Sequence, residues 1–154
     1  MTTVRAARLH KHGEPLKIEM VELPVPRDGE VLVDLAFAGV NPIDRYTAEG
    51  SVAAEGPLPR TLGFEAAGVL DGRSVVVHGE GLGTARDGVW AQAAVVPREA
   101  VTHVPEGVDL REAAAMTGCW CSGRRAESAA RSCRSLTLRA PPSGGRPARP
   151  RRRG

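Results

Sequence analysis

Apolar and polar residues alternate in three segments of the first 40 positions, at residues 4–10, 16–22 and 30–37. Such alternation puts the apolar side chains on one face of an extended chain, as in a half-buried β-strand. Glycine and proline separate the segments, and the run PVPRDGE at 24–30 has the residues of a tight turn. The pattern therefore predicts a β-rich N-terminal region.

Beyond residue 68 the pattern continues as short, valine-rich segments between glycine and proline turns. Asp109 and Glu112 have the spacing of a capping box and predict that a helix begins there. Short strands between such turns favour a mainly β fold, a barrel or sandwich with helix confined to its edges. The further predicted strands are Val69–Leu70, Ser74–His78, Val89–Val96 and Ala100–Val104.

A length of 154 residues allows one domain of ordinary size and excludes two complete domains around a cleft within this chain. Eighteen glycines and 12 prolines argue against a large helical bundle. The sequence has no apolar run of about 18 residues, as a membrane span needs, and no apolar stretch of signal-peptide length at its N-terminus. We therefore expect a cytoplasmic protein without a membrane anchor.

The net charge of +3 hides a break in composition. Residues 1–118 hold 11 Lys and Arg against 17 Asp and Glu, whereas residues 119–154 hold 10 Arg against a single Glu. All three cysteines follow the break, and three thiols without a nearby histidine do not make a zinc site. We predict one folded domain over residues 1–118 and a low-complexity, disordered, Arg-rich tail over 119–154.

Five segments of the predicted domain carry a family resemblance. They are AGVNPIDRYTAEG at 38–50, PLPRTLGFEAAGVL at 57–70, DGRSVVV at 71–77, RDGVWAQAAVVP at 86–97 and VPEGVDLREAAAM at 104–116. In this order they resemble the medium-chain dehydrogenase/reductase superfamily, in particular its zinc-free quinone oxidoreductase and zinc-type alcohol dehydrogenase-like branches. The resemblance implies a GroES-like distorted β-barrel with short edge helices, the N-terminal catalytic domain that normally packs against a Rossmann domain. We expect that Rossmann domain to be absent from this chain.

The same resemblance indicates whether the domain has a zinc site. Zinc-dependent relatives carry Cys where this chain has Asn41, and His where it has Phe64. Neither an amide nor a phenyl ring is a usual zinc ligand, so we expect no catalytic zinc. A structural zinc site would need four closely spaced cysteines, and residues 1–118 contain none.

By resemblance, three residues line the cleft where nicotinamide and substrate meet. Asn41 and Tyr46 are expected to orient the nicotinamide amide or to polarise a substrate carbonyl, with Asp44 as a supporting hydrogen-bond acceptor. The implied reaction is hydride transfer from NADPH to a quinone or an activated alkene or carbonyl. A structural alternative stays open for each residue, because Asn41-Pro42 also initiates turns and Asp44 also caps helices.

Other candidate residues favour structural roles. The glycine-rich run at 79–83 precedes another turn rather than a helix, so we expect a connecting loop and not a phosphate cradle. The four histidines lack ligand-spaced neighbours and are expected to be solvated or hydrogen-bonded. Glu65 is expected either beside the cleft or as a buried carboxylate held by backbone donors.

The tail also has an interpretation at the level of the gene. One back-translation of residues 119–129, with G or C favoured at wobble positions, reads Val-Leu-Val-Leu-Gly-Ala-Thr-Gly-Gly-Val-Gly in a shifted frame. This is a strand entering a glycine-rich turn, the form of a Rossmann cofactor loop. We therefore interpret residues 119–154 as an out-of-frame remnant of a nucleotide-binding domain.

The sequence thus predicts a truncated NADPH-dependent oxidoreductase that is inactive as this chain, with a small-molecule substrate in the full-length parent. The exposed interdomain face is expected to be apolar and prone to self-association. The alternative is a non-catalytic module that binds a partner or nucleic acid through the barrel face or the basic tail. No aromatic residues interleave with the tail arginines, which argues against nucleic acid. A nonfunctional gene remnant is a third interpretation.

Overall fold

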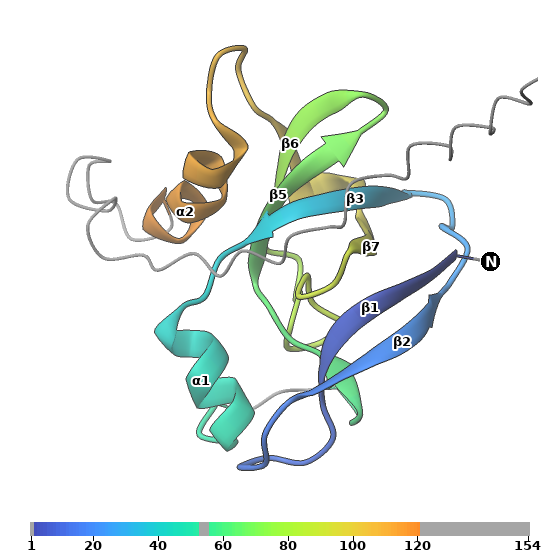
Figure 1. Cartoon of the computed structure of the whole chain (residues 1–154), viewed down its shortest axis with the longest axis vertical. Coiled ribbons are helices and arrows are strands. Elements are labelled where there is room, and N and C mark those ends of the chain that lie inside the picture. Colours follow the sequence, from blue (N-terminus) through green and yellow to red (C-terminus); the bar gives the residue numbers. More distant parts are fainter. Residues whose placement is uncertain (1, 53–55, 121–154) are drawn as a thin grey trace, which may run out of the picture.

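The computed structural model describes residues 2–52 and 56–120. Within these residues the chain forms eight strands, two α-helices and one 3-10 turn (Figure 1). The N-terminal elements are β1 (Thr2–Leu9), β2 (Lys17–Leu23), β3 (Glu30–Ala38) and α1 (Pro42–Glu49). They are followed by β4 (Arg60–Thr61), β5 (Glu65–Leu70), β6 (Arg73–His78), β7 (Ala93–Pro97), the 3-10 turn η1 (Arg98–Ala100), β8 (Val101–His103) and α2 (Leu110–Trp120).

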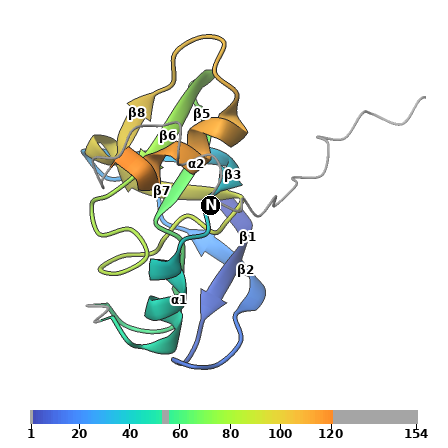
Figure 2. The same cartoon turned by 90° about the vertical axis from the view of Figure 1, so that its left-hand side faces the viewer.

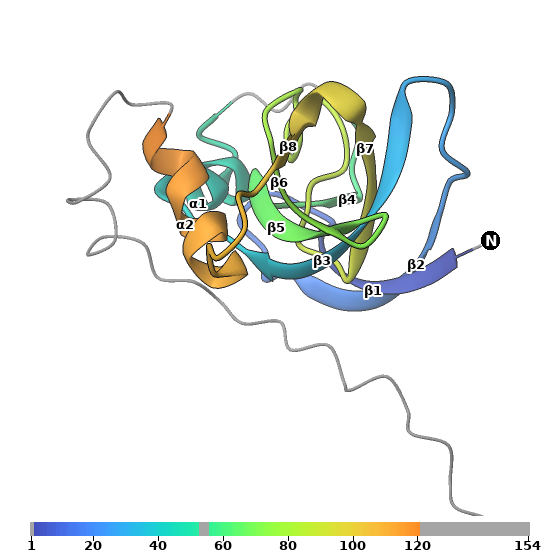
Figure 3. The same cartoon turned by 90° about the horizontal axis from the view of Figure 1, so that it is seen from above.

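The strands form two curved sheets. The smaller has the order β2-β1-β4 and the larger the order β7-β3-β5-β6-β8, and every pair of these strands is antiparallel. Figures 1 and 3 show the sheets curling toward each other as a partly closed barrel. This arrangement confirms the predicted mainly β, GroES-like fold with helices at its edges.

The concave side of the larger sheet encloses the main hydrophobic core. Alternate residues of its strands point inward, and their side chains are buried. Burial of apolar surface at about 25 cal/mol per Å² makes this cluster the principal source of stability. Its fully buried valines are Val33, Val75, Val77, Val89 and Val96.

Helix α2 covers the opposite face of the larger sheet (Figures 1 and 2). Ala113 and Ala114 are buried against Ala67 of β5, and the small size of all three residues lets the helix approach closely. At the start of α2, Asp109 Oδ1 accepts hydrogen bonds from the backbone N–H groups of Arg111 and Glu112, at 2.8 and 3.3 Å. The predicted helix start and its Asp cap are therefore confirmed.

Several parts of the structure differ from the predicted elements. Strand β5 begins at Glu65, four residues before the predicted strand, because buried small residues replace the alternating pattern there. Residues 89–92 form no strand, since Trp90 N–H donates to the carbonyl oxygen of Leu62 in an irregular crossing. Residues 42–49, which the pattern left unassigned, form α1.

The predicted tail begins within the last turn of α2, and its residues from 121 onward lie outside the described residues. In the part of the chain that the structure describes, no helix is both long and apolar enough to cross a bilayer.

Candidate functional site

Asn41 occupies the joint between β3 and α1. Its backbone is extended, and Pro42 follows at the first helical position, where a missing N–H costs nothing. Asp44 Oδ2 accepts a hydrogen bond from Asn41 N–H at 2.7 Å, and the Asn41 side chain faces the backbone N–H of Asp44. The two residues therefore form a reciprocal capping box. Both thus have the structural role that the sequence analysis considered as the alternative to a role in the cleft.

The Asn41 side chain also reaches the start of β5. Its amide nitrogen Nδ2 donates a hydrogen bond to Glu65 Oε1 at 2.7 Å. Glu65 is 3% exposed, so this contact lies in a site largely removed from water, where a hydrogen bond to a charged group is strong. Two residues 24 positions apart thus meet at the point where β3 ends and β5 begins (Figure 1).

Gly39 provides the room for this contact. A Cβ atom at position 39 would lie 2.3 Å from Glu65 Oε1, so the Glu65 side chain would have to leave its place beside Asn41. Gly39 N–H donates to the backbone carbonyl of Glu65 at 3.0 Å, and Trp90 Nε1 donates to the carbonyl of Gly39 at 2.9 Å. Both backbone polar groups of Gly39 are therefore bonded, and the indole of Trp90 braces the site.

Asp44 is the most perturbed carboxyl group of the described residues. It is 1% exposed, and burial raises the pKa of Asp44 to about 6, with a further rise from the charge of Glu65. The hydrogen bond from Asn41 N–H acts in the opposite direction and lowers this pKa. A carboxyl group of this kind exchanges its proton near neutral pH, the range in which acid-base groups of enzymes operate.

Tyr46 lies on another side of α1. Successive residues of a helix are about 100° apart, so Tyr46 points roughly opposite to Asp44. Its side chain is 47% exposed, whereas Asp44 and Thr47 are buried. The structure therefore brings Asn41 and Asp44 together with Glu65 and places Tyr46 on the solvent-facing side of the same helix.

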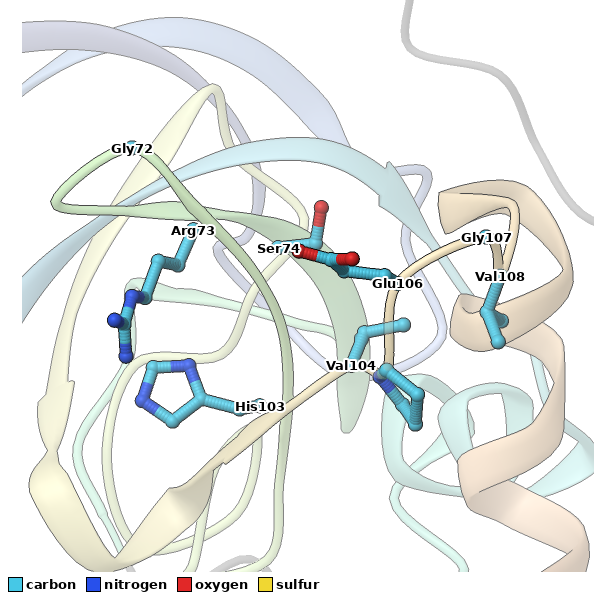
Figure 4. Close-up of a pocket in the computed structure, with 9 residues that line it drawn as sticks. Gly72, Arg73, Ser74, His103, Val104, Glu106, Gly107 and Val108 are labelled. Atoms are coloured by element: carbon cyan, nitrogen blue, oxygen red, sulfur yellow. The ribbon is translucent and has the colours of Figure 1, made fainter.

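A shallow groove of about 500 Å³ lies elsewhere, between the β5–β6 turn and the segment from β8 to α2 (Figure 4). Arg73 and His103 lie at one end of it, and Glu106 and Ser74 lie near its middle. None of the predicted site residues lines it. All of its polar side chains project from exposed turns or strand ends, so we do not assign the candidate site to this groove.

Two of the four histidines are hydrogen-bonded, in line with the structural roles expected for them. His12 Nδ1 lies 3.1 Å from the carbonyl oxygen of Thr47, and His10 Nε2 lies 3.1 Å from both carboxylate oxygens of Glu19. The Glu19 contact differs from the sequence analysis, which assigned His10 no carboxylate neighbour, because strand pairing brings the two residues together. Across residues 2–52 and 56–120, no group of three or more His, Cys, Asp or Glu side chains has the arrangement of a metal site.

The glycine-rich run at 79–83 is a connecting loop, as predicted. Glu80 and Gly81 both have positive φ, and Leu82 N–H donates to the carbonyl of Gly79 at 3.0 Å, which closes a tight turn. No helix follows this turn.

Sequence reasoning missed Gly39 and Trp90. Gly39 ends an alternating strand just before Asn41-Pro42, and a glycine at such a place signals close backbone approach. No local signal links Trp90 to Gly39, because 51 residues separate them.

Comparison with known proteins adds four findings. Residues 27–106 match the family described as "Alcohol dehydrogenase GroES-like domain". The human protein named "Quinone oxidoreductase" is 30% identical over 122 residues, which cover 73% of this chain and 37% of the human protein. A zinc-type alcohol dehydrogenase-like protein of Schizosaccharomyces pombe is 30% identical over 125 residues, covering 73% of this chain and 38% of that protein.

The structure of a cobalt- and zinc-bound thermostable alcohol dehydrogenase from Pyrobaculum aerophilum is also similar. The TM-score is 0.66 at 32% identity, over 75% of this chain and 45% of that one. This chain thus spans less than half the length of these relatives.

Proposed function

Because the chain belongs to the alcohol dehydrogenase GroES-like domain family, we propose that it is the substrate-side domain of an NADPH-dependent, zinc-free oxidoreductase. Membership of this family confirms the resemblance to the medium-chain dehydrogenase/reductase superfamily that the sequence predicted. The observation that supports the zinc-free function best is the hydrogen bond from the Asn41 amide to Glu65 at 2.7 Å. The proposed substrates are quinones and activated alkenes or carbonyls, in line with the quinone oxidoreductases among the relatives.

The donor atoms of the site argue against zinc. Catalytic zinc needs thiolate, imidazole or carboxylate ligands with free lone pairs. The Asn41 amide nitrogen instead donates to Glu65, and the side chain of Phe64 has no donor atom at all. The buried carboxyl groups of Asp44 and Glu65 would be left as the two possible ligands, fewer than the three or four protein ligands of the tetrahedral sites that zinc prefers.

NADPH, when bound, would supply a hydride to an electron-poor carbon of the substrate. Such a transfer would place negative charge on the substrate carbonyl oxygen, which a hydrogen-bond donor of the site would stabilise and a proton from water would neutralise. Asn41 and Tyr46 are the residues that we propose for the nicotinamide and substrate side, with Asp44 in support. The half-exposed phenol of Tyr46 fits contact with a bound molecule, whereas the loop at 79–83, which no helix follows, does not fit a phosphate site.

We also propose that the 154-residue chain does not catalyse NADPH oxidation by itself. A phosphate-binding loop for the cofactor has to come from outside the described residues. The test is NADPH oxidation with 1,4-benzoquinone by the purified chain, with and without EDTA or added zinc. We expect the rate of the no-protein control in every case. A rate well above that control would contradict the inactivity, and a rate that required zinc would contradict the zinc-free site.

The origin of residues 119–154 has its own test, which is resequencing the gene across the codons for Ala113 to Ser128. We propose that these reads restore the frame of a longer reductase. Reads that confirm the printed sequence would contradict the out-of-frame interpretation.

A second proposed function is binding of a partner by the barrel surface, with self-association as its simplest form. Ile18 and Met20 support it, because they are 64% and 61% exposed on the same face of edge strand β2. Truncation of the chain at Gly118 distinguishes the two surfaces. Binding that survives truncation points to the barrel, and binding that is lost points to the Arg-rich tail.

A further inference from the structure

We propose that Glu65 is a positioning residue that holds the Asn41 side chain as a hydrogen-bond donor toward the carbonyl oxygen of the substrate. This inference rests on the proposed function, and it chooses between the two roles considered for Asn41. The amide would serve the substrate carbonyl and would not accept a hydrogen bond from the nicotinamide amide.

The Asn41 side chain uses one of its two N–H donors in the contact with Glu65. A primary amide has two N–H donors and one carbonyl acceptor. One side-chain N–H is donated to Glu65 Oε1 at 2.7 Å, and the carbonyl end is turned toward the backbone N–H of Asp44, which itself donates to the backbone carbonyl of Asn41 at 3.0 Å. The second N–H is the donor that is left, and Asn41 is only partly buried, so a ligand can reach it.

Glu65 determines which end of the amide points where. An ionised carboxylate only accepts hydrogen bonds, so it selects the NH₂ end of Asn41 and turns the carbonyl end away. The neutral amide of a Gln in place of Glu65 would make this selection less strongly, because hydrogen bonds to charged groups are stronger. The result is an amide with one orientation before any ligand arrives.

The surroundings hold Glu65 in turn. Gly39 leaves room for its carboxylate, since a Cβ atom at position 39 would lie 2.6 Å from Glu65 Cγ and 2.3 Å from Oε1. The backbone of Glu65 is bonded to Gly39, which is bonded to the Trp90 indole. Such support from neighbouring groups is what a preorganised donor requires.

The nearby charges suggest which substrates suit this donor. Asp44 and Glu65 are both buried, and the effect of Glu65 on the pKa of Asp44 shows that the two carboxyl groups interact. A neutral carbonyl oxygen gains from the Asn41 N–H as negative charge develops on it. A free carboxylate would meet the negative charge of Glu65, so quinones and enones are favoured over unsaturated acids.

The contact can be tested on the whole chain, labelled with ¹⁵N and ¹³C, at pH 7. We expect an NMR coupling through the hydrogen bond between Asn41 Nδ2 and the Glu65 carboxylate carbon. We also expect hydrogen exchange at Asn41 Nδ2 to be about tenfold faster in Glu65→Leu than in the unchanged chain, and about threefold faster in Glu65→Gln, which keeps an acceptor without the charge. The matched control is Glu22→Leu, which removes an exposed carboxylate on β2.

Absence of the coupling in the unchanged chain would overturn the positioning role, even if Glu65→Leu does not fold. Equal exchange in a folded Glu65→Leu variant would overturn it as well. For the donor role, we expect 2-cyclohexen-1-one to shift the Asn41 Nδ2 proton resonance, and crotonate at the same concentration to leave it in place. A missing shift with the enone, or an equal shift with crotonate, would overturn the donor role. None of these readouts needs NADPH or turnover, so an error in the proposed function would not alter them.

Discussion

Strands β5 and β2 differ by one residue in length and have opposite environments. The first four residues of β5 are buried, and the strand lies between β3 and β6 with α2 on one face and the core on the other. Strand β2 pairs only with β1, and Lys17, Ile18, Met20 and Glu22 on it are exposed.

The formation of the two strands depends on different properties of their side chains. Strand β5 has little room for side chains between α2 and the core, and the small residues Ala66, Ala67 and Gly68 fit there. On β2 the alternation of exposed and half-buried positions is enough to form a strand, and the identity of each exposed residue matters little. We therefore expect the effects of substitution to decrease from β5 and the core beneath it to β2.

The largest effect is expected where β5 has no room for a side chain. A Cβ atom at Gly68 would lie 2.0 Å from the backbone carbonyl oxygen of Asp34, next to the β-bulge of β3. Backbone cannot move aside cheaply, so Gly68→Val should abolish folding, as followed by circular dichroism at 25 °C. The control Gly72→Ala lies in open space with φ +76°, and it should cost only about 1 kcal/mol. A cooperatively folded Gly68→Val protein would contradict the close packing of β5 on β3.

The next effect concerns the core under β5. Leu82 is 1% exposed within the cluster that contains Ala66, and Leu82→Ala should lower the free energy of unfolding by about 3 kcal/mol through lost burial and a cavity. Urea denaturation measures this change. Val25→Ala, at a residue that is 73% exposed, is the matched control and should change stability by less than about 0.5 kcal/mol. Similar losses for the two variants would remove the distinction between core and surface.

A smaller, pH-dependent effect comes from Asp44, beside the start of β5. Its pKa in the folded chain, about 6, lies above the ordinary value of 3.8. The folded state therefore binds the proton more tightly, and this group contributes stability below pH 4 that is lost as the pH rises to 6. The contribution is on the order of 3 kcal/mol.

Asp44→Asn keeps an acceptor for Asn41 N–H and removes the titration. The difference in unfolding free energy between this variant and the unchanged chain should vary between pH 4 and pH 7 and be constant above it. A constant difference over the whole range would contradict the raised pKa.

The smallest effect is expected on β2. Met20→Ala should change the free energy of unfolding by less than about 0.5 kcal/mol, because the side chain is 61% exposed. The same variant should weaken any concentration-dependent association seen by sedimentation, since it removes half of the Ile18–Met20 pair. A loss of more than 1 kcal/mol would mean that β2 is packed as β5 is.

The contrast between the strands also explains what could be predicted from the sequence. Alternation located β1, β2, β3 and β6 within a few residues, because one face of each strand is less exposed than the other. The start of β5 escaped prediction because Glu65, Ala66, Ala67 and Gly68 are buried without alternating.

Helix α1 escaped because its eight residues are too short for a periodic pattern, and its capping signals were compatible with a turn. The candidate site could be predicted only in part, because only some of its contacts join residues that are close in the sequence. Asn41 and Asp44 are three residues apart and meet by helix geometry, whereas Asn41 and Glu65 meet only because β3 and β5 pair. Long-range contacts of this kind leave no local trace in a single sequence.

The bond between Trp90 and Gly39 also gives the protein a built-in optical reporter. The chain has two tryptophans, and Trp120→Phe would leave Trp90 as the only indole fluorophore. Since its Nε1 is bonded to the residue that makes room for Glu65, its emission maximum responds when water replaces that bond. Local opening of the site would then be visible as a red shift at denaturant concentrations too low to change the circular dichroism of the sheets.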